Sequence, residues 1–513
     1  MSKQSTTKKI KMVKYIENKK TFNMKQLLMV LYLSFVIFSQ VFIYQDNIFI
    51  YILSLLAIFI FVIPLSMLII NAESDFTIPK EVRTKNQEQK NFILNFLIIF
   101  TLGLIIYNIK FLSGKGQYEA DFMWALQQAR DNSYVEFSSP VFILLFAKLP
   151  QLIADNPVFI STFYVFIRSL VVSYIITKLS INKIVNIVLL LYYSLMPLSL
   201  HSEMTLMKDT PCSLCIMLTL IFTYETLEET DNKKNTSTDI LIALFAVLST
   251  FMRPNAILFS IPFILVLYKV FRYNLIRALR ISGIFLALFL ALTALLPQVI
   301  SIRKSDTSWN MVETMSIPAS VVMAVARYSP DALNEKEMEY LHVICGDDLE
   351  ALKSFDEKQG WESVKFNKSI YNRKDLPFTY LDLASYTLDL IIKKPAISLK
   401  QIIRSTSSLY GYRYIKYPRK NIFAGIYYFF ANIELGLLFF LFISSLISKT
   451  NFLQGKYINF LLALPILILS VVTMLIIASP AITRYYLPLQ MSLPIYLVNI
   501  YTVKNMSNCG RGL

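Results

Sequence analysis

The hydrophobic positions of this chain fall in long uninterrupted runs, not at the spacing of an amphipathic helix or strand. About 20 apolar residues suffice to cross a bilayer as a helix, which satisfies its own backbone hydrogen bonds in hydrocarbon. The pattern predicts an all-α polytopic membrane protein with about twelve transmembrane helices. The predicted spans are residues 26–44, 48–70, 91–109, 155–177, 184–200, 211–227, 239–252, 255–271, 281–301, 424–447, 457–477 and 483–501.

One apolar run, Pro140 to Ile153, is too short for a span and contains Lys148 and Pro150. It predicts a helix at 140–153 that lies in the outer membrane interface. With this helix kept outside, the inner segments carry 23 Lys and Arg and the short outer segments seven. Since Lys and Arg of short loops stay in the cytoplasm, both termini are predicted to be cytoplasmic.

Hydropathy drops between residues 302 and 423, where 15 of the 34 acidic residues lie together with 18 Lys and Arg. This segment predicts an extracytoplasmic, mainly helical soluble domain, with a loop opening into a helix at Pro330–Glu335 and helical spacing from Leu381 to Ile403 around Pro395. The predicted organisation is a basic cytoplasmic tail (1–25), two N-terminal spans and an inner loop (26–90), a membrane core (91–301) with outer acidic loops (110–138 and 201–210) and the interfacial helix (140–153), the soluble domain (302–423), three C-terminal spans (424–501) and a cytoplasmic tail (502–513).

The composition fits a multi-pass protein of the cell membrane, with 55% hydrophobic and 16% charged residues and a mean hydropathy of +0.52. We interpret the net charge of +16 as inner loops facing anionic lipid, because no nucleic-acid-binding motif accompanies it. Two histidines argue against a His-rich metal site and a Ser-His-Asp hydrolase. Cys212 and Cys215 have a redox or metal spacing, but they fall in a predicted span, where packing explains them better.

A polar hinge between hydrophobic runs carries Glu119 and Asp121, followed by Gln128. A carboxylate at the outer lipid–water boundary can accept a proton from a hydroxyl nucleophile or hold a divalent cation. Asp121 could instead complement the dipole of a helix that begins there.

A second outer loop contains Glu203, Lys208 and Asp209 ahead of Pro211. Lys208 is suited to a phosphate, and Asp209 to assisting Asp121 or binding a metal. Loop solvation and helix capping by Asp209 explain the same residues equally well.

Two arginines lie at predicted outer boundaries, Arg253 before Pro254 and Arg484 before Tyr485. An arginine between apolar helices can grip a lipid phosphate through two hydrogen bonds. Each could equally be an anchor in an aromatic belt. Arg168 and Glu434 fall inside predicted spans, where a charge must face protein or water, and they favour a transporter most.

Together these features resemble the membrane glycosyltransferases of the C-type fold, and more closely a bacterial family of polytopic membrane proteins known only as a domain of unknown function. The resemblance covers about residues 90–500, and Ser139-Pro140 stands where such proteins often have His-Pro. The first two spans are an addition to the usual arrangement. The matching motifs are Asp121 with Gln128-Ala129, Met207-Lys208-Asp209, Arg253-Pro254-Asn255, Ser316-Ile317-Pro318 and Lys393-Lys394-Pro395.

The resemblance implies transfer of a sugar from a polyprenyl-phosphate donor to a cell-envelope glycan or lipid acceptor on the extracytoplasmic face. Asp121 and Asp209 would be catalytic, with Asp121 as general base or metal ligand, and Lys208, Arg253 and Arg484 would hold the donor phosphate. The supporting residues would be Glu119, Gln128, Glu203 and Tyr485, and a divalent cation is an optional cofactor.

Three other functions stay open. A flippase or transporter of lipid-linked saccharides would use Arg168, Glu434 and Pro254, and a polysaccharide polymerase or ligase would use outer Arg and His residues. A noncatalytic membrane assembly protein requires none of these residues.

Overall fold

The computed structural model describes most of the chain between residues 84 and 502. The described residues are 84–110, 120–135, 139–195, 206–228, 236–272, 274–303, 312, 315–346, 349–357, 360–365, 377–406, 454–477 and 487–502. The predicted tail at 1–25, the spans at 26–44, 48–70 and 424–447, and residues 503–513 lie outside them.

The described part is mostly helical, at 86% of its residues. Among the described residues, four helices are long and apolar enough to cross a membrane: α5 (Lys85–Lys110), α9 (Pro157–Leu179), α12 (Asp209–Glu228) and α15 (Leu275–Val299). Their length and composition indicate that the protein associates with a membrane.

The other helices described in this region include further apolar segments. They are α6 (Ala120–Asp131), α7 (Pro140–Ile143), the π-helix η4 (Leu144–Lys148), α8 (Leu149–Ile153), α10 (Lys183–Leu195), α13 (Thr236–Met252), the 3-10 helix η5 (Pro254–Ala256), α14 (Ile257–Val270), α24 (Gln454–Ile477) and α25 (Leu487–Thr502). Nine of the twelve predicted spans fall on described helices. The run at 140–153, predicted to lie in the outer interface, forms a continuous helix as α7–η4–α8.

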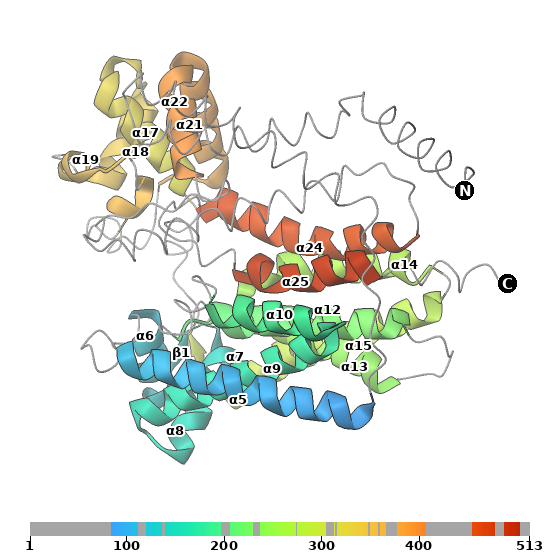
Figure 1. Cartoon of the computed structure of the whole chain (residues 1–513). Helices are drawn as coiled ribbons and strands as arrows, with labels where there is room; N and C mark the ends of the chain where they lie inside the picture. Colours follow the sequence, from blue (N-terminus) through green and yellow to red (C-terminus); the bar gives the residue numbers. More distant parts are fainter. Residues whose placement is uncertain are drawn as a thin grey trace, which may run out of the picture. The chain divides into compact units, whose positions relative to one another are not determined.

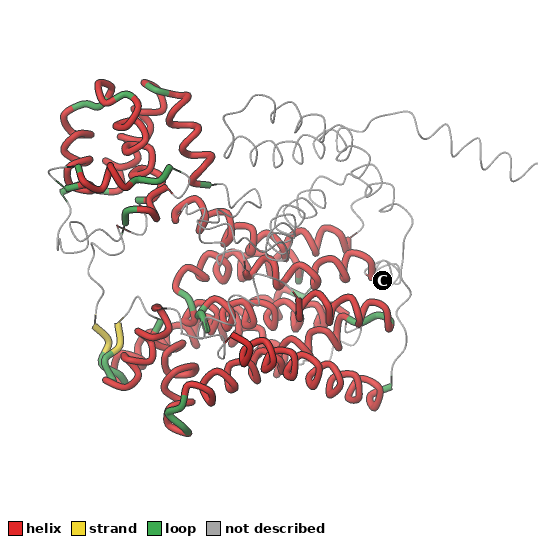
Figure 2. The backbone as a smooth tube through the Cα atoms, turned by 60° about the vertical axis from the view of Figure 1, so that its left-hand side comes forward, coloured by secondary structure: helices red, strands yellow, loops and turns green. Residues whose placement is uncertain are grey.

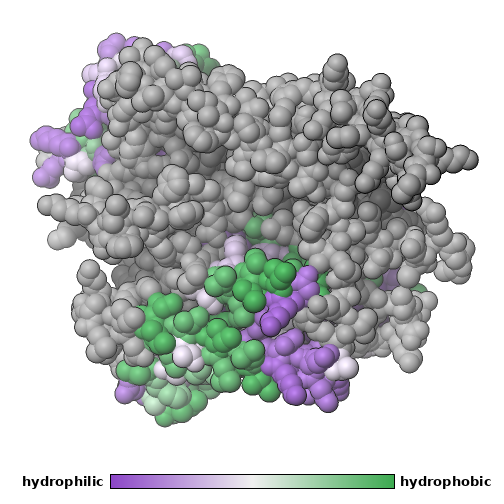
Figure 3. All heavy atoms as spheres, in the orientation of Figure 1, coloured by the Kyte–Doolittle hydropathy of each residue, from purple (hydrophilic) through white to green (hydrophobic). Residues whose placement is uncertain are grey.

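The apolar helices pack side by side in a bundle (Figures 1 and 2). α5 packs on α9, α12 on both α13 and α25, and α14 on α24. α5 and α15 leave apolar side chains such as Leu97, Leu290 and Val299 exposed, as expected of helices that face lipid. Figure 3 shows this hydrophobic surface on the α5 side, with hydrophilic residues at its right-hand end, where α5 begins.

A buried charge cluster joins three helices at the start of α13. Asp239 is fully buried there and lies 2.7 Å from Arg277 and 2.5 Å from Arg280, both on α15. Arg277 also donates a hydrogen bond to Thr226 near the end of α12. Two arginines that the charge pattern assigned to anionic lipid therefore have a protein carboxylate as partner.

Buried polar contacts also tie the helices together along their length. Asn95 of α5 donates to Thr177 of α9 and exchanges hydrogen bonds with Asn186 of α10. Arg168, buried in α9, donates to the backbone carbonyl of Tyr193 in α10. This contact gives the buried guanidinium a polar partner, which an arginine inside an apolar bundle requires.

The insert between α15 and α24 forms its own helical core. Its elements are α17 (Ser316–Tyr328), η6 (Pro330–Ala332), α18 (Glu335–Cys345), α19 (Glu350–Ser354), η7 (Gly360–Ser363), α21 (Tyr380–Lys393) and α22 (Pro395–Ser405). The helix predicted after Pro330 begins at Glu335, and Asn334 forms its capping box. The residues with helical spacing around Pro395 form two helices, α21 before it and α22 from it.

Trp361 is the centre of this core. It is fully buried, its indole N–H donates to the carbonyl of Val312 at 2.9 Å, and its backbone N–H donates to Ser320 Oγ at 2.8 Å. The preceding Gly360 has a φ of 59°, and a Cβ there would lie 2.9 Å from Ser320 Oγ. Only glycine therefore fits this turn without strain.

Glu337 gives the insert a testable pH dependence. It is fully buried in α18, and burial raises the pKa of its carboxyl although Lys393 lies 3.5 Å away. Because its folded-state pKa exceeds the unfolded value, the contribution of Glu337 to stability is fully present below the unfolded pKa and is lost as pH rises through the folded pKa. As pH rises from about 4 to 7, we expect the free energy of unfolding of Glu337→Gln to fall less than that of the wild type.

This prediction is checked by denaturant unfolding of the whole protein, with Trp361 as the fluorescent reporter and the other two tryptophans replaced by phenylalanine. Glu335→Gln, on an exposed position of the same helix, is the control. Identical pH slopes for wild type and Glu337→Gln would contradict the prediction.

Candidate functional site

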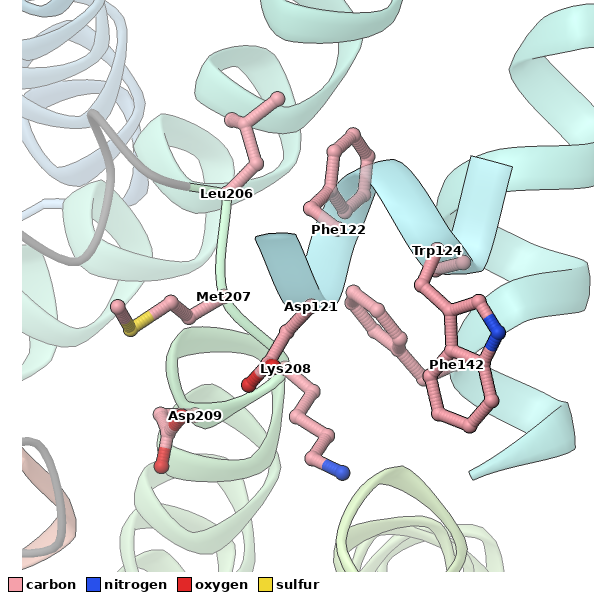
Figure 4. A pocket seen from close by; sticks show the side chains of 9 residues that line it. Asp121, Phe122, Trp124, Phe142, Leu206, Met207, Lys208 and Asp209 are labelled. Carbon is pink, nitrogen blue, oxygen red and sulfur yellow. The ribbon is translucent and has the colours of Figure 1, made fainter. Parts of the chain in front are cut away.

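A small pocket lies where the first turn of α6 meets the segment that leads into α12. Its cavity of about 40 Å³ has room for a few water molecules or one small polar group. Figure 4 shows the side chain of Asp121 between the Leu206–Asp209 segment and the rings of Phe142 and Trp124. The full lining is Asp121, Phe122, Trp124, Ala125, Phe142, Leu206, Met207, Lys208 and Asp209.

Two helix N-termini and one lysine offset the two carboxylates that line the pocket. Asp121 lies in the first turn of α6 and Asp209 in the first turn of α12, and Lys208 immediately precedes α12. Helix N-termini carry partial positive charge and unsatisfied N–H groups, so they stabilise carboxylates and bind phosphate oxygens. The exposed carboxylate of Asp121 is in this field. The geometry therefore combines a proton acceptor with groups that attract an anion.

Asp209 and Arg253 form an ion pair beside the pocket. Asp209 is 1% exposed and the arginine side chain 9%, so both charges are removed from water. α12 begins at Asp209 and α13 ends at Met252, so these two antiparallel helices bring the pair together at one end. Arg253 does not line the cavity, and its partner in the structure is a protein carboxylate. From the sequence, phosphate binding and an anchor in an aromatic belt were equally open roles for it.

Polar contacts hold α6 against the helix at 140–153. Lys148 donates to the carbonyl of Ala129 at 2.9 Å, and Gln151 donates to that of Leu126 at 3.3 Å. Arg130 and Asp155 form a more exposed pair at 3.1 Å. These contacts fix the position of α6, and with it that of Asp121 in its first turn.

Gln128 lies at the far end of α6 from Asp121. Its side-chain carbonyl accepts the backbone N–H of Val135 at 2.7 Å. That residue belongs to β1 (Tyr134–Val135), which pairs in parallel with β2 (Ile302–Arg303) just after α15. Gln128 thus stabilises the segment that follows α6. It does not line the pocket.

Aromatic residues that the sequence analysis did not single out form one wall of the pocket. The Phe122 and Phe142 rings are 6.1 Å apart, Phe142 stacks on Phe146 at 5.7 Å, and Phe146 meets Tyr164 at 5.5 Å. The Tyr164 hydroxyl donates to the carbonyl of Met207 on the opposite wall. The signal available in the sequence was the spacing of Asp121 and Trp124, three residues apart on one helix face.

Backbone strain accompanies these residues. Ser139 and Leu206 have φ values of 64° and 54°, in the left-handed region that residues other than glycine rarely adopt. Leu206 lines the pocket, and Ser139 precedes the helix that contributes Phe142. The Ser139 hydroxyl is buried and has no hydrogen-bond partner within the described residues. Such strain persists only where the surrounding structure imposes it, and it is common at functional sites.

Four predicted site residues, Glu119, Glu203, Arg484 and Tyr485, lie outside the described residues. Among the residues that are described, no group of three or more His, Cys, Asp or Glu side chains could hold a metal ion. Cys212 and Cys215 are buried in α12, a setting that suits packing.

Comparisons with protein-family models, curated proteins and solved structures find no match to this chain. The functional argument therefore depends on the geometry of the site.

Proposed function

We propose that this protein is a membrane glycosyltransferase of the C-type fold. It transfers a sugar from a polyprenyl-phosphate donor to a cell-envelope glycan or lipid acceptor. The observation that carries the proposal is that Asp121 and Lys208, from segments far apart in the sequence, line one pocket with Trp124 and Phe142. A carboxylate, a cation and aromatic rings are the groups that a phosphate-linked sugar and a hydroxyl acceptor need.

In this mechanism Asp121 is the general base. It takes the proton of the acceptor hydroxyl as that oxygen forms a bond to the anomeric carbon of the sugar. The bond from the anomeric carbon to the phosphate oxygen breaks, and its electron pair stays on the polyprenyl phosphate. Lys208 and the N-terminus of α12 stabilise the negative charge that develops there. A divalent cation bound by Asp121 and the donor phosphate would serve the same purpose.

The Asp209–Arg253 ion pair lies beside the pocket and holds its walls in place. It fixes the start of α12 next to Lys208, so we assign both residues to positioning. Arg484, beside Tyr485, remains our second candidate for the donor phosphate.

The proposal includes a topology of about twelve spans in the plasma membrane, with both termini in the cytoplasm. The pocket and the Asp239 cluster support it, because they lie at opposite ends of α13. The 17 residues of α13 correspond to about 26 Å of helix, close to the thickness of a hydrocarbon core. A topology reporter fused near residue 180 tests it. A reporter found outside the cytoplasm would mean that residues 140–153 cross the membrane and that the topology is wrong.

Lys208→Met tests the role of the cation. A hydrogen bond to a charged group contributes about 1.5–3 kcal/mol, so we expect kcat/KM for the donor to fall by roughly 10- to 100-fold. The measurement is transfer of radiolabel from a polyprenyl-phosphate sugar in membranes that contain the variant.

Lys269→Met, at an exposed position on α14, is the matched control and should leave transfer unchanged. An unaltered kcat/KM in Lys208→Met would remove Lys208 from the site. If wild-type membranes transfer no sugar from any polyprenyl-phosphate donor, the proposed function itself is wrong.

A further inference from the structure

The exposed apolar side chains of the soluble insert gather on α21 and α22. Leu381, Leu388 and Ile392 on α21 are 82%, 61% and 79% exposed, and Leu399 on α22 is 48% exposed. Among the described residues of the insert, the other large exposed apolar side chains are Tyr380, at the start of α21, and Tyr328. A concentration of this kind marks an interaction surface, whereas isolated exposed apolar residues do not.

Helix α21 is apolar on two opposite faces. Leu383 and Leu390 are buried in the core of the insert. At 100° per residue, Leu381 and Leu388 each lie about 160° around the helix from these buried residues. An apolar face of a helix is normally covered by another apolar surface. The core of the insert covers one face of α21, so the second face requires another apolar partner.

Lysines accompany the exposed apolar face. Lys393, Lys394 and Lys400 lie at the α21–α22 junction and on α22, next to Ile392 and Leu399. Lys393 is held by Asp389 at 2.5 Å and by Glu337. Apolar side chains next to lysines are typical of helices that lie in the interface of a bilayer containing anionic lipid.

The insert is also tethered close to a bilayer. The apolar helix α15 ends at Val299, and β2 ends at Arg303. The core of the insert begins at Val312, so eight residues join the two. Even fully extended, eight residues reach at most about 29 Å. The start of the insert's core is therefore held close to the end of an apolar, membrane-length helix.

We propose that the face formed by Leu381, Leu388, Ile392 and Leu399 docks on the surface of the lipid bilayer, with Lys394 and Lys400 against anionic headgroups. The proposal does not rest on the transferase function. It predicts that these four side chains insert at the level of the headgroups, while the side of the insert that carries Asp331 stays in water.

The test places a fluorescent label sensitive to its surroundings at Leu388→Cys in the full-length protein. Cys212, Cys215 and Cys345 are buried, so Cys509→Ser is the only additional change in the background. Leu388 is mostly exposed, and its replacement should leave folding intact. The protein is reconstituted in nanodiscs of phosphatidylcholine and phosphatidylglycerol, with or without brominated acyl chains.

We expect brominated lipid to quench the label at Leu388→Cys several-fold, and the label at the exposed control Asp331→Cys very little. Lys394→Glu with Lys400→Glu should reduce the quenching at Leu388→Cys. Equal quenching at positions 388 and 331 would overturn the proposal. A label at 388 that is shielded from water but not quenched would overturn it too, because a protein segment or a second copy would then cover this face.

Discussion

Asp121→Asn is expected to abolish sugar transfer and to leave the amount of protein in the membrane unchanged. The amide has nearly the shape of the carboxylate but cannot accept the proton of the acceptor hydroxyl. Loss of a general base reduces the rate by about 10²- to 10⁴-fold, which would bring transfer to background. Because the Asp121 side chain is exposed in the first turn of α6, the replacement should cost little stability.

The measurement is release of radiolabel from the polyprenyl-phosphate donor to the acceptor, normalised to the amount of variant in the membranes. Asp131→Asn is the matched control, since Asp131 is an exposed acid at the other end of the same helix, where it accepts from Gln127. A fully active Asp121→Asn would exclude Asp121 as the base. Equal losses in both variants would show that the charge of α6, and not the position of Asp121, is what matters.

The helices of the fold follow from the sequence because long apolar runs have few alternatives in a membrane. The run at 140–153 is found as a helix with its predicted bounds, and Asn334 caps α18 where the loop was expected to open. Tertiary contacts were not predictable in the same way. Nothing in the local sequence indicates that Asp239 meets Arg277 and Arg280 across two helix connections.

The candidate site was predictable only in part. Asp121 and Lys208 were identified because charges between apolar runs are conspicuous, and the pocket brings both together. Trp124 and Phe142 were missed, because an aromatic residue at helical spacing looks the same whether it fills a core or lines a cavity. Arg253 was predicted to hold a phosphate because its carboxylate partner is 44 residues away in the sequence.

Arg253→Met is expected to destabilise the protein by about 3–5 kcal/mol, because it leaves the Asp209 carboxylate buried without a countercharge. Unfolding of the detergent-solubilised protein measures this loss. Arg130→Met breaks a pair whose side chains are 48% and 51% exposed, so it should cost only about 0–1 kcal/mol and serves as the control.

The double variant Asp209→Leu with Arg253→Met separates a positioning role from phosphate binding. It removes both buried charges, and such replacements are often neutral in stability, so we expect most of the loss to be recovered. If Arg253 only positions the start of α12, sugar transfer should return together with stability. A double variant that folds as well as wild type but has lost affinity for the donor would instead mean that Arg253 binds the phosphate directly. A stable but inactive Arg253→Met would indicate the same, since the ion pair with Asp209 would then contribute little to the fold.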